Sequence, residues 1–77
     1  MHYVYLLKNE RTQSIYIGVS SNLRRRLTEH QKSAPWKLVY YEAFLDLQDA
    51  RDRERKLKNY GAGLGHLKNR LRKSLQV

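Results

Sequence analysis

The chain has 77 residues, which predicts one domain near the lower size limit for a hydrophobic core without crosslinks. It has no cysteine, so disulfides and thiolate metal sites are excluded and a cytoplasmic location is expected. No apolar run approaches a membrane span, and no signal peptide is expected from the first residues of the sequence. Sixteen Lys and Arg against seven Asp and Glu give a net charge of +9, which predicts nucleic acid as partner, although solubility alone also explains it.

Two tyrosine-containing segments open the chain and predict a β-hairpin. Tyr3-Val4-Tyr5 and Tyr16-Ile17-Gly18 flank a polar stretch at 8–14, which is typical of two strands joined by a turn. If Tyr5 lies opposite Tyr16, one face is aliphatic and the other carries the tyrosines and the glycine, whereas a slip by one residue mixes the two sets. The same register pairs Val4 with Ile17 and Leu6 with Ile15. Because tyrosine is a common strand residue, a purely structural hairpin is the alternative to a functional site.

A helix is expected after the hairpin, from about residue 23 to residue 31. Ser20-Ser21-Asn22 offers its N-cap, and Pro35 bars its continuation. A third strand, rich in Val, Tyr and Phe, is expected at 38–45.

Two more helices are expected in the C-terminal half. Asp46 caps the first, with Asp49 three residues later, and this helix reaches about Tyr60, where Gly61 takes the C′ position. Two further glycines predict a loose turn before a last helix from about 64 or 66 to 75. The order ββαβαα defines an α+β fold, in which helices flank a three-stranded antiparallel sheet, with residues 1–77 in one domain.

Polar side chains interrupt the apolar face of the first expected helix. Arg26 and His30 share that face with Leu23 and Leu27 and are themselves i, i+4 neighbours. A cation and an imidazole are therefore expected at the edge of the buried face. The simpler explanations are an arginine that extends to solvent and a helix-end histidine favoured by the helix dipole.

An acid interrupts the apolar face of the second expected helix in the same way. Glu54 lies between Ala50 and Leu57 on that face, where a carboxylate is costly unless it is paired or binds a metal. An ion pair with one of the many arginines is the simpler explanation, and a metal site is the functional one.

Together, Tyr5, Tyr16, Arg26, His30 and Glu54 form a set suited to phosphodiester cleavage. A carboxylate with water holds a hard divalent cation, which neutralises the phosphate and stabilises the leaving oxygen. An arginine stabilises charge in the transition state. A tyrosine or a histidine takes a proton from the attacking water.

These residues, in this order, resemble the motifs of the GIY-YIG nuclease superfamily. The likeness is carried by Tyr3-Val4-Tyr5, by the stretch from 16 to 30, by 36–42, by 50–54 and by Lys58. It is greatest with small stand-alone bacterial members and extends to the N-terminal nuclease domain of the bacterial excision-repair endonuclease. The first triplet is Tyr-Val-Tyr rather than Gly-Ile-Tyr. It differs at the first two positions and keeps the terminal tyrosine, which is the one with a chemical role in the family.

The resemblance implies a metal-dependent endonuclease and a role for each residue of the set. Tyr5 and Tyr16 match the tyrosines of the two triplets, one of which is the general base in proposed family mechanisms. Arg26 matches the arginine at the scissile phosphate, and His30 matches a histidine that assists proton transfer or orients a tyrosine. Glu54 matches the metal-binding glutamate, and the metal would be Mg²⁺ or Mn²⁺.

The placement of basic residues predicts a surface for nucleic acid. From Arg55 to the C-terminus there are seven basic residues and no acid, which is typical of non-specific phosphate contacts. Arg24 and Arg25 point away from the apolar face of their helix and form a solvated basic face. The expected contacts to DNA are Arg24, Arg25, Lys56, Lys58, Lys68, Arg70, Arg72 and Lys73.

Three functions fit the sequence. The first is a metal-dependent endonuclease that acts on DNA with weak intrinsic sequence preference. The second is a catalytically silent nucleic-acid-binding module of the same fold, and the third is a basic protein-interaction or ribosome-associated piece that needs no metal. The complete set favours the nuclease, because a silent descendant is expected to lose Tyr16, Arg26 or Glu54.

Overall fold

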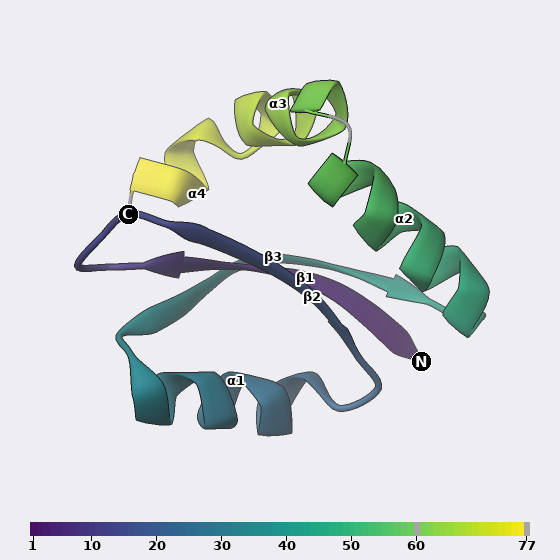
Figure 1. Ribbon diagram of the computed structural model, residues 1–77, viewed down its shortest axis with the longest axis horizontal. Helices are drawn as coiled ribbons and strands as arrows, with labels where there is room; N and C mark the ends of the chain where they lie inside the picture. Colours follow the sequence, from purple (N-terminus) through teal and green to yellow (C-terminus); the bar gives the residue numbers. More distant parts are fainter. Residues whose placement is uncertain (60, 77) are drawn as a thin grey trace.

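The computed structural model describes residues 1–59 and 61–76 and has an α+β fold in which helices cover both faces of a three-stranded sheet (Figure 1). The sheet is antiparallel, with the strand order β2-β1-β3. Helix α1 covers one face, and α2, α3 and α4 cover the other. The elements are β1 (His2–Asn9), β2 (Ile15–Ser20), α1 (Leu23–Ser33), β3 (Trp36–Phe44), α2 (Leu47–Asn59), α3 (Gly61–Arg70) and α4 (Arg72–Gln76). The expected fold class is confirmed.

The hairpin register differs by two residues from the one expected. Tyr5 pairs with Gly18, and Tyr16 pairs with Leu7. The expected register leaves a two-residue turn, whereas the side-chain Oδ1 of Asn9 accepts hydrogen bonds from the backbone of Arg11 and Thr12 and builds a longer one. Gln13 completes that turn in a left-handed conformation, with a φ of 67°. Because the slip is by two residues, every side chain keeps its expected face.

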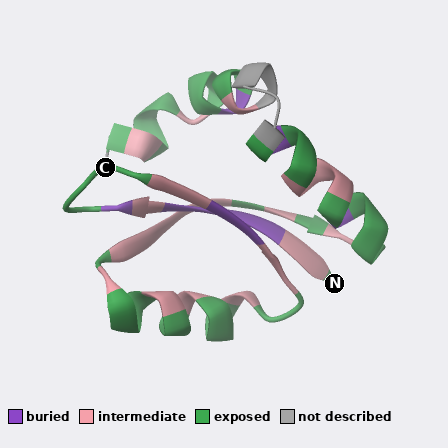
Figure 2. Ribbon diagram, in the orientation of Figure 1, coloured by how far each residue is buried: buried purple, intermediate pink, exposed green. Residues whose placement is uncertain are grey.

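The expected separation of faces is confirmed. Val4, Leu6 and Ile17 belong to one buried cluster, which lies between the sheet and helices α2 and α3. The helices contribute Ala50, Leu57 and Leu67 to that cluster. Figure 2 shows that the buried residues concentrate in the middle of the sheet, with a few more on α2 and α3. The tyrosine face lies under α1, where a polar site can form without interrupting the main core.

Strand β3 begins two residues earlier than expected and contains a bulge. The pairing with β1 shifts between Leu6 and Leu7, so that Tyr40 and Leu38 lie opposite these neighbours. Val39 and Tyr40 both pack against the main core. The bulge therefore lets two consecutive residues face the core, and it sends Leu38 and Tyr41 to the side of α1.

Both expected helix N-caps are present. The side-chain Oδ1 of Asn22 accepts a hydrogen bond of 3.1 Å from the backbone N–H of Arg25, and α1 begins one residue after Asn22. The Oδ1 of Asp46 accepts from the backbone N–H of Gln48 at 2.7 Å and starts α2 in the same way.

The C-terminal helices differ from the expectation. Gly61 begins α3, and Gly63 and Gly65 lie inside it, so the loose turn predicted from these glycines is wrong. Leu67 is buried in the main core, and Leu64 packs against it, so tertiary packing overrides the low helix propensity of glycine. The last helix is divided at Leu71 into α3 and α4. The expected end of α2 at Tyr60 lies outside the described residues.

Among residues 1–59 and 61–76, no helix has the length and apolar character needed to cross a membrane.

Candidate active site

A cleft of about 690 Å³ opens between β2, the start of α1 and the exposed side of α2. Tyr16 comes from β2, Arg26 from α1 and Glu54 from α2, and all three side chains line this cleft. Three members of the expected set therefore meet at one place, although they come from three separate elements. Lys58, an expected DNA contact, also lines the cleft.

Gly18 allows the two tyrosines of the set to approach each other. A Cβ atom at Gly18 would lie 2.5 Å from the hydroxyl oxygen of Tyr5 and 3.0 Å from Cε1 of Tyr16. The Tyr5 ring therefore lies directly over the backbone of β2, in space that any side chain at this position would fill. The ring centroids of Tyr5 and Tyr16 are 6.1 Å apart.

His30 joins the two tyrosines. The hydroxyl of Tyr5 and Nε2 of His30 share a hydrogen bond of 3.1 Å, and the imidazole centroid lies 4.7 Å from that of Tyr16. Trp36 also lies near Tyr16, with 6.1 Å between the ring centroids. The five expected residues are thus brought together, but Tyr5 and His30 lie behind the cleft rather than on its lining.

Tyr5 is the most enclosed member of the set, with none of its surface exposed. Burial raises the pKa of its phenol above the ordinary value of 10.0, and the nearby Arg26 guanidinium opposes that rise only partly. Its hydroxyl therefore stays protonated near neutral pH, which suits a hydrogen-bonding role better than that of a general base.

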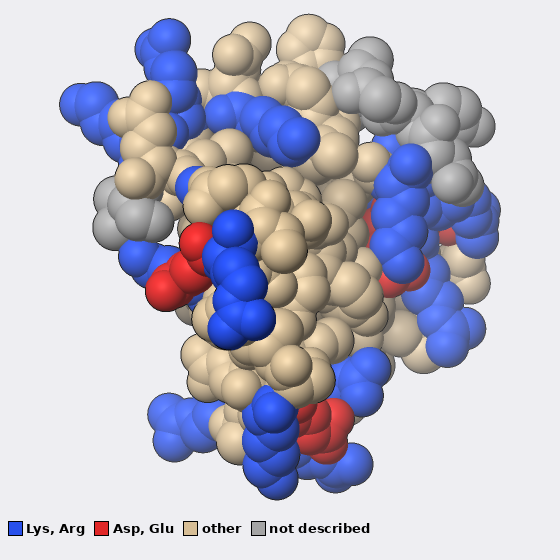
Figure 3. Space-filling view, turned by 60° about the vertical axis from the view of Figure 1, so that its left-hand side comes forward, with Lys and Arg blue, Asp and Glu red and all other residues tan. Residues whose placement is uncertain are grey.

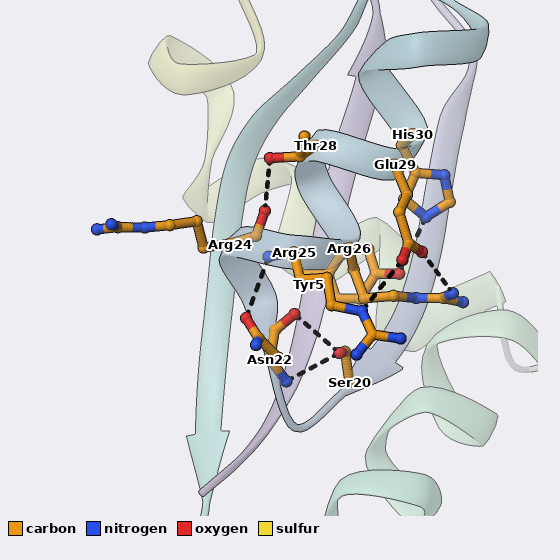
Figure 4. A network of polar contacts seen from close by, with 9 residues as sticks. All are labelled: Tyr5, Ser20, Asn22, Arg24, Arg25, Arg26, Thr28, Glu29 and His30. Atoms are coloured by element: carbon orange, nitrogen blue, oxygen red, sulfur yellow. Dashed lines mark hydrogen bonds and ion pairs between the residues drawn. The ribbon is translucent and has the colours of Figure 1, made fainter.

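The Arg26 side chain extends into the cleft from the N-terminal half of α1 and forms an ion pair with Glu29. Its Nη1 donates to Oε2 of Glu29 at 3.1 Å, and its side chain stays 45% exposed. The Tyr5 hydroxyl and then Glu29 raise the pKa of Arg26, so the guanidinium is fully charged. Figure 4 shows Arg26 and His30 on the same side of α1 as Tyr5. Sequence reasoning missed Glu29, although its spacing of three residues from Arg26 predicts the pair.

Glu54 is partly buried, with 25% of its side chain exposed, and its Oε2 accepts an ion pair of 3.2 Å from Lys58. Its partner is thus a lysine one turn away, not one of the arginines. Within residues 1–59 and 61–76, no three His, Cys, Asp or Glu side chains gather as a metal site. A single carboxylate in an open cleft still fits Mg²⁺ or Mn²⁺, because such ions keep most of their water and take substrate phosphates as ligands.

Two arginines on the lining of the cleft were missed from the sequence. Arg51 and Arg55 lie on α2 beside Glu54 and, with Lys58, give this side of the cleft three cations. Arg51 lies three residues before Glu54 and four residues before Arg55, and these helical spacings are the signal that could have identified the two arginines. His2, at the start of β1, also lines the cleft, and no pattern in the sequence points to it.

The other expected DNA contacts are exposed but lie outside the cleft. Arg24 and Arg25 are on α1, and Arg25 is paired with Glu29 at 3.2 Å. On the face shown in Figure 3, lysine and arginine side chains surround a largely uncharged centre. The remaining expected contacts lie exposed on α2, α3 and α4 and are Lys56, Lys68, Arg70, Arg72 and Lys73.

Comparison with known proteins agrees with the family resemblance of the sequence. The family model described as the GIY-YIG catalytic domain matches residues 1–62, and the chain belongs to the GIY-YIG family. A UPF0213 protein of Clostridium perfringens is 36% identical over 67 residues, covering 75% of this chain and 71% of the relative. A UPF0213 protein of Oceanobacillus iheyensis is 32% identical over 66 residues, covering 74% and 76%. No solved structure matches the sequence.

Proposed function

We propose that the protein is a metal-dependent endonuclease that hydrolyses phosphodiester bonds in DNA with weak intrinsic sequence preference. The observation that carries this proposal is the meeting of Tyr16, Arg26 and Glu54 on the lining of one cleft. The family supports a nucleic-acid substrate, and the net charge of +9 favours a polyanion.

The cationic residues of the cleft bind the scissile phosphate. Arg26 approaches from α1, while Arg51 and Arg55 approach from α2, so positive charge faces the substrate from two sides. A phosphate competes with Glu29 for Arg26, and an exposed ion pair of this kind costs little to exchange. Charge that develops on the phosphate in the transition state is stabilised by donors that are already in position.

Tyr16, acting as a phenolate, is the tyrosine that takes a proton from the attacking water and becomes a neutral phenol. It lines the cleft, whereas Tyr5 is fully enclosed and has a raised pKa. Tyr5 and His30 form a hydrogen-bonded pair behind Tyr16, and their rings hold its phenol in place. This arrangement separates the two tyrosines into a reacting group and a supporting group.

Glu54 is the residue that holds the cation, either Mg²⁺ or Mn²⁺. When bound, the cation neutralises phosphate charge and stabilises the leaving oxygen. The carboxylate is the only acid on the lining of the cleft among the described residues, and it lies on α2 across from Tyr16. Lys58 holds this carboxylate in the absence of a cation and becomes free to contact a phosphate when the pair opens.

The second candidate is a silent nucleic-acid-binding module, favoured by the ion pairs that already occupy Glu54 and Arg26. Supercoiled plasmid incubated with the purified protein distinguishes the two. We expect nicking with Mn²⁺ or Mg²⁺ and none with a chelator, and Tyr16→Phe should lose nicking while it still binds the plasmid. Binding without any nicking, in the presence of either cation, would favour the silent module.

A further inference from the structure

A second hollow lies beside the N-terminal end of α1, between that helix and β3. This groove has a volume of about 460 Å³ and is lined by leucines of α1 and β3 together with Tyr3 and Tyr41. Ser21 lines both the groove and the catalytic cleft, so the two hollows meet at the loop between β2 and α1. A linear polymer that occupies the cleft can therefore continue into the groove.

Tyr41 is the unusual residue of this groove. Its side chain is on β3, and 52% of its surface is exposed, although large aromatic residues are favoured in cores. The ring meets Tyr3 edge to face, with 5.9 Å between the centroids and 69° between the planes. Ala43, the next residue on this side of β3, is small and exposed. The ring of Tyr41 thus offers open aromatic surface at the mouth of an apolar groove.

A cation stands at the same groove. Arg24 lines it and, in the part of the chain that the structure describes, makes no ion pair, whereas Arg25 and Arg26 both pair with Glu29. Figure 4 shows the Arg24 side chain extending away from Arg25 and Arg26. The groove therefore combines an open aromatic ring, an apolar floor and an unpaired cation.

We propose that this groove binds an unpaired nucleobase of the DNA strand whose scissile phosphate occupies the catalytic cleft. The base stacks on Tyr41 over the leucine floor, and Arg24 contacts the phosphate that joins it to the next nucleotide. Every base has a π-face, so stacking on an aromatic side chain suits single strands and tolerates any sequence. The inference rests on the proposed function and narrows it, because a base still stacked within a duplex cannot enter the groove.

Charge favours this occupant over a second copy of the chain. Two copies each carry a net charge of +9 and repel each other, and Arg24 would face a like-charged surface. A nucleotide supplies a base whose apolar face matches the leucine floor, and a negative charge that complements Arg24.

The test compares two probes without metal, so that no cleavage is needed: an oligothymidylate and an abasic phosphodiester oligomer of equal length. We expect wild-type protein to bind the oligothymidylate more tightly, and Tyr41→Ala to weaken that binding about tenfold, the scale of one lost base–aromatic stack. Binding of the abasic oligomer and the dependence on salt should not change, since no phosphate contact is lost. Tyr41→Phe keeps the ring and should retain binding. Leu45→Ala, at a residue 86% exposed and outside the groove, is the matched control.

Photo-crosslinking gives an independent measurement with the unaltered protein. An oligonucleotide carrying 5-iodouracil should crosslink to Tyr41 or Tyr3, as identified by mass spectrometry of the peptides. The inference would be overturned if Tyr41→Ala weakened the binding of both oligomers equally, or did not weaken the binding of either. Crosslinks only to other segments would also overturn it. If the protein nicks plasmid but does not prefer the oligothymidylate, the base-binding groove is excluded and the proposed nuclease function stands. If the protein prefers the oligothymidylate but does not nick plasmid, the nuclease function is excluded and the base-binding groove stands.

Discussion

The backbone of Gly18 lies against the hydroxyl of Tyr5, so that a Cβ on Gly18 would stand 2.5 Å from that oxygen. The contact joins neighbouring strands, since Tyr5 and Gly18 are paired in the sheet. It lets the Tyr5 ring lie against β2, where its hydroxyl forms a hydrogen bond with His30 of α1. The glycine of the second triplet is therefore required by the position of the tyrosine of the first.

Gly18→Ala is expected to displace the Tyr5 ring and to break its hydrogen bond with His30. Because this site is closely packed, we expect a loss of about 1–3 kcal/mol in the free energy of unfolding, with a fall in nicking activity. Gly65→Ala is the matched control, since a Cβ there meets nothing within 4 Å and the residue lies inside α3. That change should leave stability equal or raise it by up to about 1 kcal/mol. Chemical unfolding of both variants measures the difference, and equal effects would contradict the packing argument.

The raised pKa of Tyr5 predicts how the free energy of unfolding changes at alkaline pH. Its phenol has an ordinary pKa of 10.0 in the unfolded chain, and burial raises the pKa in the folded protein. The protonated phenol therefore contributes stability that is complete below about pH 10 and is lost as the pH rises through the folded pKa. We expect the free energy of unfolding of Tyr5→Phe to fall less steeply above pH 10 than that of the wild type.

Urea unfolding, followed by the fluorescence of Trp36 over a series of alkaline pH values, measures this effect. Tyr40→Phe is a useful comparison, because burial and Glu42 raise the pKa of Tyr40 as well. Each variant should remove only the part of the fall in the free energy of unfolding above pH 10 that its own tyrosine causes. Curves for Tyr5→Phe and wild type that run in parallel above pH 10 would show that Tyr5 is not buried as described.

Arg26, rather than Arg24 or Arg25, is expected to be the catalytic cation. Only Arg26 of the three lines the cleft. Arg26→Ala should lower the turnover by about a hundredfold or more, the scale of one lost preorganised donor. Arg25→Ala should have a small effect on the chemical step, and it serves as the control because Arg25 also pairs with Glu29. Single-turnover nicking at saturating DNA separates these outcomes, and equal losses in both variants would indicate a simple basic patch.

The exposed basic residues of α3 and α4 are expected to contact phosphates without reading sequence. If about four to six phosphates are neutralised in all, the logarithm of the affinity should fall with the logarithm of the salt concentration with a slope of about −3 to −5. Neutralising Lys68 and Arg72 together should reduce that slope by about one to two units. Titrations of unrelated DNA sequences at several salt concentrations give the slope, and an unchanged slope would place the DNA surface elsewhere.

The faces of the sheet and the positions of Arg26 and Glu54 could be predicted because they follow from periods of two and of about 3.6 residues. The register of the hairpin could not, because it depends on the Asn9 side chain and on a left-handed Gln13. The enclosure of Tyr5 also depends on Gly18 across the sheet, a tertiary relationship that no spacing along the chain reveals.

The most direct test of the account is the effect of Glu54→Gln on plasmid nicking in the presence of Mn²⁺. The change keeps the shape of the side chain and removes the charge, so we expect no detectable nicking, nearly unchanged DNA binding and a loss of at most about 0.5 kcal/mol from the pair with Lys58. Asp49→Asn, an exposed acid of α2 outside the cleft, should nick like the wild type. Nicking by Glu54→Gln at the wild-type rate would contradict the assignment of Glu54 as the residue that holds the metal.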